Sequence, residues 1–97
     1  MKKIYQIVIY NSISDQNKLN NYAKLSGPAV KKAGGKILGR GIPIEVREGG
    51  KKTRTVLIEW ESLNDAMDCY HGEDYQKALL ELDNSATREF RYIEGID

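Results

Sequence analysis

The pattern of apolar and polar positions predicts a β-hairpin at the centre of the chain, with the other elements arranged around it. Two β-prone apolar runs, 37–46 and 53–60, flank a turn at Gly49-Gly50, where the lack of a Cβ atom permits positive φ angles. Pro43 cannot donate a hydrogen bond to a neighbouring strand. We therefore expect residues 39–46 to form an irregular arm rather than a continuous inner strand.

Residues 3–11 and 88–94 alternate in the manner of a first and a last strand. In the first strand neither alternating set of side chains is plainly polar. The two sets are Tyr5, Ile7, Ile9 and Ile4, Gln6, Val8, Tyr10. A strand with one solvated face normally shows a polar set, so we expect both faces of this strand to be covered.

Helical spacing fills the regions between these strands. Ser14-Asp15 is a good N-cap pair, and the apolar residues that follow it recur at three- and four-residue intervals. We expect Gly27-Pro28 to kink or break this helix, because proline removes a backbone donor, and Gly34-Gly35 to end it. A second helical region begins with the capping-box-like sequence 62–65 and is divided at His71-Gly72.

This order, β-α-β-β-α-β, predicts an α+β fold: one ferredoxin-like domain over residues 1–97, with its helices on one face of a four-stranded sheet. The opposite face would then expose many large Ile, Val and Tyr side chains, which need a cover. The simplest cover is the same face of a second copy. We therefore expect a homodimer formed through the sheet face.

Charge and cysteine content narrow the range of partners. The net charge of +1, from 15 basic and 14 acidic side chains, gives no electrostatic reason to expect nucleic acid or an anionic membrane as a partner. The basic side chains of Lys51, Lys52 and Arg54 are predicted to lie in water at the hairpin tip. Cys69 is the only cysteine, so no disulfide can form within the chain, which favours a reducing compartment. The apolar run after Met1 is short and is neither a signal peptide nor a membrane span. We expect a cytoplasmic protein.

The sequence predicts neither a metal nor a cofactor. One histidine and one cysteine do not provide the ligands of a usual zinc or iron site. The glycines between positions 34 and 41 follow a helix and enter a strand. Dinucleotide- and phosphate-binding motifs place their glycines between a strand and a helix N-terminus instead.

Short motifs spread over nearly the whole chain carry a family resemblance. They are Tyr5, Tyr22, Gly34-Gly35, Gly39-Arg40-Gly41, Glu48-Gly49, the run 56–63, Tyr70, Tyr75 and Ile93-Glu94-Gly95. In these motifs the chain resembles the domain-of-unknown-function 1330 family of the dimeric α/β-barrel superfamily. The resemblance implies a ferredoxin-like protomer that forms a dimeric α/β barrel, and it implies no assigned reaction. Related branches of the superfamily include cofactor-independent monooxygenases, isomerases, decarboxylases, haem-handling enzymes and ligand-sensing domains.

Arg40 and Glu59 are the candidate polar residues of the predicted sheet. Arg40 lies between two glycines, and its guanidinium offers donors for a carboxylate or an enolate oxygen. The alternative is an ion pair with a neighbouring acid or across the dimer. Glu59 points to the face of its strand opposite to that of Ile58 and Trp60. Burial there would make its carboxylate more basic and so favour a role as general base. The alternative for Glu59 is a structural pair with Arg40 or Arg88.

One histidine and three tyrosines complete the candidate site. Histidine side chains can exchange a proton near neutral pH, so His71 is a candidate catalytic acid or base; the alternative is an exposed or helix-capping residue. Hydroxyls for a ligand could come from Tyr10, Tyr22, Tyr70 and Tyr75, of which the last three are the candidate ligand-binding residues. The alternative is that each belongs to a half-buried core tyrosine with a solvated hydroxyl.

Two functions fit these residues. The first is a homodimer that binds a small organic molecule between the sheet and the helices of each protomer. As an enzyme it would act without a cofactor on an activated carbonyl compound, by proton transfer or oxygenation, with Glu59 or His71 as the base and Arg40 as the oxyanion holder. The second is a non-catalytic ligand-binding or structural dimer in which Arg40 and Glu59 form an ion pair. The sequence alone does not decide between an enzyme and a binding protein.

Overall fold

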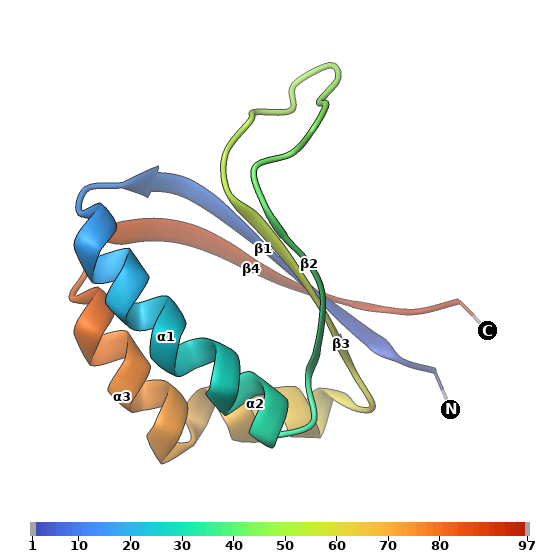
Figure 1. Cartoon of the computed structure of the whole chain (residues 1–97). Helices are drawn as coiled ribbons and strands as arrows, with labels where there is room; N and C mark the ends of the chain where they lie inside the picture. The colour runs from blue at the N-terminus through green and yellow to red at the C-terminus, as the bar shows by residue number, and fades with distance from the viewer. Residues whose placement is uncertain (1, 97) are drawn as a thin grey trace.

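A computed structural model, which describes residues 2–96, contains one antiparallel sheet with three helices on one of its faces (Figure 1). The elements are β1 (Ile4–Ile13), α1 (Gln16–Lys32), β2 (Lys36–Gly41), β3 (Thr55–Trp60), α2 (Leu63–His71), α3 (Glu73–Leu82) and β4 (Ala86–Glu94). The strands lie in the order β2-β3-β1-β4. The predicted ferredoxin-like α+β fold is confirmed, and Gly72 separates α2 from α3 as expected.

The core lies between the helices and the sheet face that they cover, which we call the inner face. Alternate residues of each strand point to this face, and the side chains of Val8, Ile58 and Trp60 are buried there. Trp60 is 2% exposed, and its indole Nε1 donates a hydrogen bond to Gln6 Oε1 at 2.9 Å. This bond explains why a glutamine occurs in the buried set of β1.

Helix α1 begins and ends as its sequence predicts. The carboxylate of Asp15 accepts a hydrogen bond from the Lys18 backbone N–H at 3.1 Å, which satisfies a free donor of the first turn. Gly34, just after the helix, has a φ angle of +100°. Helical structure nevertheless continues through Pro28, so of the expected kink or break the break does not occur. Ala29 and Val30, which follow the proline, are buried, and their packing holds the last turns in place.

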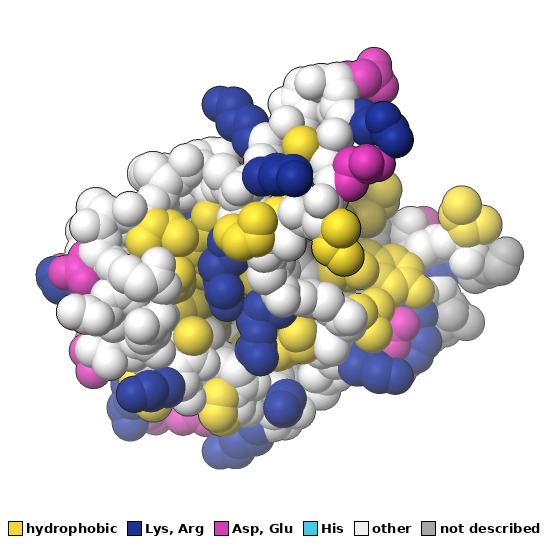
Figure 2. Space-filling view, turned by 45° about the horizontal axis from the view of Figure 1, so that its top comes forward, with side chains coloured by type: hydrophobic (Ala, Val, Ile, Leu, Met, Phe, Trp, Pro, Cys, Tyr) yellow, Lys and Arg dark blue, Asp and Glu magenta, His cyan; other side chains and the backbone are white. Residues whose placement is uncertain are grey.

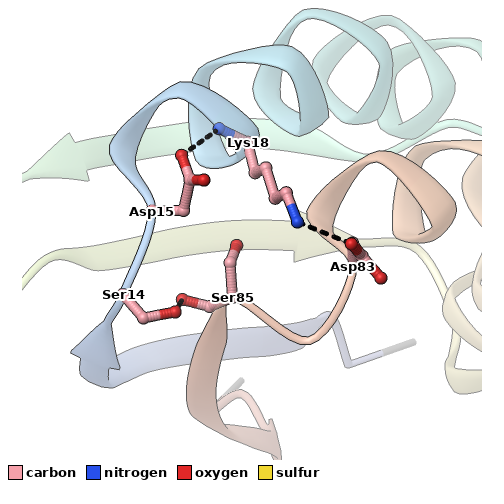
Figure 3. A network of polar contacts seen from close by, with 5 residues as sticks. All are labelled: Ser14, Asp15, Lys18, Asp83 and Ser85. Carbon is pink, nitrogen blue, oxygen red and sulfur yellow. Dashed lines mark hydrogen bonds and ion pairs between the residues drawn. The ribbon is translucent and has the colours of Figure 1, made fainter.

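A group of polar contacts fastens the start of α1 to the connection between α3 and β4 (Figure 3). Lys18 Nζ lies 2.6 Å from the Asp83 carboxylate, and the Ser14 hydroxyl donates to the Ser85 carbonyl oxygen at 3.1 Å. The pKa of Asp83 is lowered by its hydrogen bond with Lys18. These bonds join two segments that are far apart in the sequence and close this end of the helical layer.

Residues 42–54, which we call the arm, connect β2 to β3 and project away from the body of the molecule (Figure 1). The chain leaves the sheet after Gly41, so the prediction of an irregular arm is confirmed for residues 42–46 and is wrong for residues 39–41, which belong to β2. The positive φ angle of the turn lies at Glu48, at 56°, rather than at Gly49 or Gly50, so that detail of the predicted hairpin is wrong. Ile44 on the arm is 96% exposed.

The second face of the sheet, the outer face, carries no helix (Figure 1). Tyr5, Ile7 and Ile9 of β1 are half-buried on it, and Leu57 of β3 is exposed. In a single copy of residues 2–96 this face is therefore uncovered, although the sequence predicts a cover for it.

Within the same residues, no helix combines the length and the apolar composition needed to cross a membrane.

Candidate functional site

A cleft between α1 and the inner face of the sheet contains a cavity of about 50 Å³. Its walls are largely apolar: Val8, Val56 and Ile58 come from the central strands, Val30 from α1 and Phe90 from β4. These strand residues share the inner face because side chains alternate along each strand. This enclosed space holds a few water molecules or one small chemical group, so the body of a larger ligand would extend from it through the open side of the cleft.

Three arginines also line this cleft: Arg40 from β2, Arg54 from the end of the arm and Arg88 from β4. In the sheet register Arg40 lies opposite Val56 and Arg88 opposite Tyr10, both inner-face residues. None of the three forms an ion pair with any residue of 2–96, although seven such pairs occur elsewhere in that range. Figure 2 shows basic side chains in a hollow among hydrophobic ones, with the visible acidic side chains at the periphery.

Arg88 is held by aromatic rings and by hydroxyl groups. Its guanidinium carbon lies 4.7 Å from the ring centre of Phe90, 4.9 Å from that of Tyr22 and 5.4 Å from that of Tyr10. Its Nη1 donates to the Tyr22 hydroxyl oxygen at 2.9 Å. Burial acts to lower the pKa of Arg88, but the neighbouring oxygens of Tyr22 and Tyr75 outweigh this and raise it. Arg88 is thus a permanent positive charge inside the cleft.

Arg54 has a hydrogen-bond donor without a partner. Its Nε is buried, and no acceptor within residues 2–96 reaches it. The guanidinium lies 5.6 Å from the ring centre of Tyr10, which stabilises its charge without satisfying this N–H group. A buried donor of this kind costs about 1–3 kcal/mol when it has no acceptor. Arg54 thus brings a buried donor without an acceptor to the wall of the cleft.

Arg40 reaches from β2 towards α1. Its Nη1 lies 3.9 Å from the position that a Cβ atom on Gly27 would occupy, so the small residue leaves room for the guanidinium. The residue as a whole is exposed. Arg40 therefore stands at the solvent side of the cleft, where a ligand could reach its guanidinium.

Tyr22 and Tyr75 connect α1 to α3 at the cleft wall. Their hydroxyl oxygens are 2.6 Å apart, and both side chains are buried. Burial raises the pKa of Tyr75, and the nearby Tyr22 oxygen raises it further. Tyr70, the third predicted tyrosine, does not line the cleft. Its ring packs against those of Tyr75 and Phe90, at centre-to-centre distances of 5.3 and 6.0 Å.

Glu59 and His71 lie away from the cleft. Glu59 pairs with Tyr5 in the sheet register and is on the outer face, where the Tyr5 hydroxyl donates to its Oε1 at 3.4 Å. His71 is exposed at the end of α2 and packs against the ring of Tyr70 at 5.2 Å. The structure does not bring either residue to the arginines.

The expected ion pair between Arg40 and Glu59 is wrong. The two side chains point to opposite faces of the sheet, and no ion pair joins them. The irregularity in the β2–β3 register between Ile37 and Gly39 is what places Arg40 beside Val56 on the inner face. The pairing of Glu59 with Arg88 fails for the same reason, because Arg88 also points inward.

Sequence reasoning misses two of the three cleft arginines. It places Arg54 at a solvated hairpin tip and considers Arg88 only as a partner for Glu59. The signal that could have found them is alternation along a strand. Arg54 lies two and four residues before the apolar Val56 and Ile58, and Arg88 lies two residues before Phe90, so each arginine is expected on the same sheet face as those residues.

Within residues 2–96 no group of three or more His, Cys, Asp or Glu side chains could hold a metal ion.

Comparison with known proteins places the chain in a family. The sequence model of the family described as "Domain of unknown function (DUF1330)" matches residues 3–96. The chain belongs to this family. No curated protein matches it.

The DUF1330 chain is similar in fold to several solved structures. A protein of unknown function from Rhodopseudomonas palustris aligns over 99% of this chain and 84% of its own length, with 12% identity and a TM-score of 0.75. A dimeric protein of unknown function with a ferredoxin-like fold, from Bacteroides fragilis, aligns over 95% of both chains at 15% identity and a TM-score of 0.62. SnoaB, a cofactor-independent oxygenase from Streptomyces nogalater, aligns in a mutant form over 100% of this chain and 96% of its own, at 9% identity and a TM-score of 0.68. Identities this low establish the shared fold of the DUF1330 chain and nothing finer.

Proposed function

We propose that this DUF1330 protein binds a small organic anion, a carboxylate or an enolate, in the cleft between α1 and the sheet. The observation that carries the proposal is the set of three cleft arginines with no acidic partner in residues 2–96. Positive charge in an apolar setting is stabilised best by a bound anion. The unpartnered Nε of Arg54 supplies a donor for it.

The apolar walls define the rest of the ligand. Val8, Val56 and Phe90 have side chains that offer no hydrogen bonds, so the ligand has an apolar body attached to its anionic group. An enolate of an activated carbonyl compound meets both requirements and is a substrate for cofactor-independent proton transfer or oxygenation. We assign no catalytic role to Glu59 or His71, because neither lines the cleft.

We further propose that two copies pack through their outer faces to form a dimeric barrel. The half-buried Tyr5, Ile7 and Ile9 and the exposed Leu57 give this face the apolar character that a dimer interface needs. The ferredoxin-like protein from Bacteroides fragilis is described as dimeric, which supports the same arrangement here.

Phenylacetate, a carboxylate with an apolar ring, tests the anion proposal. We expect titration calorimetry to detect binding, and Arg54→Gln to weaken it at least about tenfold, since a charge-assisted hydrogen bond contributes about 1.5–3 kcal/mol. Arg47→Gln is the matched control, because Arg47 pairs with Glu45 on the arm and does not line the cleft. Equal weakening by both substitutions, or no binding by the unaltered protein, contradicts the proposal.

A further inference from the structure

We propose that Tyr22 is the catalytic residue of this cleft, a phenol that exchanges a proton with a bound enolate, and that Arg88 and Tyr75 are its positioning residues. The inference rests on the proposed function, because it requires an anionic ligand beside the arginines. It goes further by assigning a reaction type and the group that performs it.

The composition of the cleft leaves few groups that can transfer a proton. Within the described part of the chain, no carboxylate, histidine, lysine or cysteine lines it. The arginines stay protonated at any ordinary pH, and the side chains of Gln6 and Ser26 do not ionise in that range. The remaining candidates are the phenols of Tyr10, Tyr22 and Tyr75.

Hydrogen bonding distinguishes Tyr22 from the other two. Arg88 Nη1 lies 2.9 Å from the Tyr22 oxygen, and the Tyr75 hydroxyl lies 2.6 Å from it. The Tyr10 oxygen is 3.5 Å from Arg88 Nη1, and no second phenol within residues 2–96 bonds to it. Because Tyr22 is placed between a guanidinium and another phenol, negative charge on its oxygen is stabilised by two donors.

Either hydroxyl of the Tyr22–Tyr75 pair can donate while both phenols are neutral. When negative charge develops on the Tyr22 oxygen, Tyr75 is the donor, because burial raises its pKa and keeps its proton in place. The Tyr22 oxygen then accepts from both Tyr75 and Arg88. Its own O–H is left free of these partners and available to a ligand in the cleft.

The step balances without an oxidant or a cofactor. In the ketonisation direction the Tyr22 O–H bond breaks and a C–H bond forms at the nucleophilic carbon of the enolate, whose C=C electron pair makes the new bond while its C–O⁻ becomes C=O. The negative charge moves to the Tyr22 oxygen, where Arg88 and Tyr75 stabilise it. Water then returns a proton to Tyr22 and completes the cycle.

The test uses the enol form of phenylpyruvate as substrate, which gives the enolate by releasing its O–H proton to water, and phenylacetate as a non-reacting ligand. The proton that returns to Tyr22 from water balances the one that the enol releases. Ketonisation is followed by ultraviolet absorbance, and deuterium at the new C–H position by NMR in D₂O. We expect Tyr22→Phe to lower the protein-dependent rate by about a hundredfold or more, the usual contribution of a general acid, while phenylacetate still binds. Tyr92→Phe is the control, because Tyr92 lies on the same sheet face but does not line the cleft.

Tyr75→Phe removes one donor to Tyr22 and should lower the rate by less than Tyr22→Phe does. This second variant also keeps the inference testable if Tyr22→Phe fails to fold. If the unaltered protein binds phenylacetate but does not speed ketonisation, or if Tyr22→Phe and Tyr75→Phe both keep the full rate, the inference is wrong and anion binding stands. If the unaltered protein does not bind phenylacetate, the proposed function itself is contradicted.

Discussion

The guanidinium of Arg88 lies against three aromatic rings and two phenol oxygens, and it forms no ion pair with a carboxylate within residues 2–96. Aromatic faces stabilise a cation by their quadrupole and leave its N–H groups partly free. A carboxylate would instead have neutralised the charge and filled the donor positions. At the scale of single residues, this choice of partner is what makes the cleft suitable for an external anion.

Residue alternation explains which cleft residues a sequence can reveal. Arg40, Tyr22 and Tyr75 are singled out by the sequence, and all three line the cleft. Glu59 is wrongly grouped with Arg40 because the register between their strands, with its irregularity in β2, is not visible in a sequence. Arg54 escapes notice because basic residues near a turn are usually solvated.

The ionisation of two tyrosines, the half-buried Tyr92 and the buried Tyr75, predicts how stability depends on pH. Burial raises the pKa of Tyr92 to about 12 from an ordinary value of 10.0, so its stabilising effect is complete below the ordinary value and is lost as the pH rises towards the folded value. The pKa of Tyr75 is raised in the same direction. We therefore expect the free energy of unfolding to fall above a pH of about 10.

Denaturant unfolding at a series of alkaline pH values measures this fall. Tyr92→Phe removes one of the responsible groups without breaking a side-chain hydrogen bond within residues 2–96, so its stability should decline less steeply with pH than that of the unaltered protein. Identical slopes for the two proteins would contradict the raised pKa of Tyr92 in the folded state.

At the scale of elements, the cleft depends on how closely β2 and α1 approach β3. Gly35, the residue before β2, lies directly against the ring of Trp60. A Cβ atom at Gly35 would lie 2.9 Å from Trp60 Cη2 and 2.5 Å from Val30 Cγ1. The order and type of all the elements are predictable from apolar spacing and caps. The continuity of α1 through Pro28 is not, because it depends on the packing of Ala29 and Val30.

Gly35→Ala should therefore destabilise the fold. Overpacking of this kind costs about 1–3 kcal/mol, because the Trp60 ring and the end of α1 must move apart. Gly39→Ala, in β2 with no heavy atom within 4 Å of the added methyl group, is the matched control. Thermal unfolding should give a lower Tm for the first variant than for the second. Equal values would mean that β2 shifts freely, and the position of Arg40 would then not be fixed.

At the scale of the whole molecule, the sheet has one face covered by helices and one face open (Figure 1). The sequence predicts this imbalance, since both alternating sets of β1 contain large apolar residues. The proposed dimer resolves it by placing two outer faces together, on the side of each sheet away from its cleft. Each protomer would then keep its own set of cleft arginines.

A charge on the outer face tests the dimer. Leu57→Glu should convert the dimer to monomer, raising its Kd at least about a hundredfold, because an unpaired carboxylate is costly in an apolar interface. Leu80→Glu is the control, since Leu80 is 78% exposed on α3, a helix on the covered side. Sedimentation equilibrium distinguishes the outcomes. A monomer already present in the unaltered protein at micromolar concentration would contradict the proposed assembly.

The most direct measurement of the central claim is the NMR signal of the Arg54 Nε–H group during a titration with phenylacetate. This donor is buried and has no partner within residues 2–96, so an anion that enters the cleft should become its acceptor. We expect the Arg54 signal to move downfield and to exchange more slowly with water as phenylacetate is added, while the Arg47 signal does not change. An Arg54 signal that stays constant throughout the titration would contradict it.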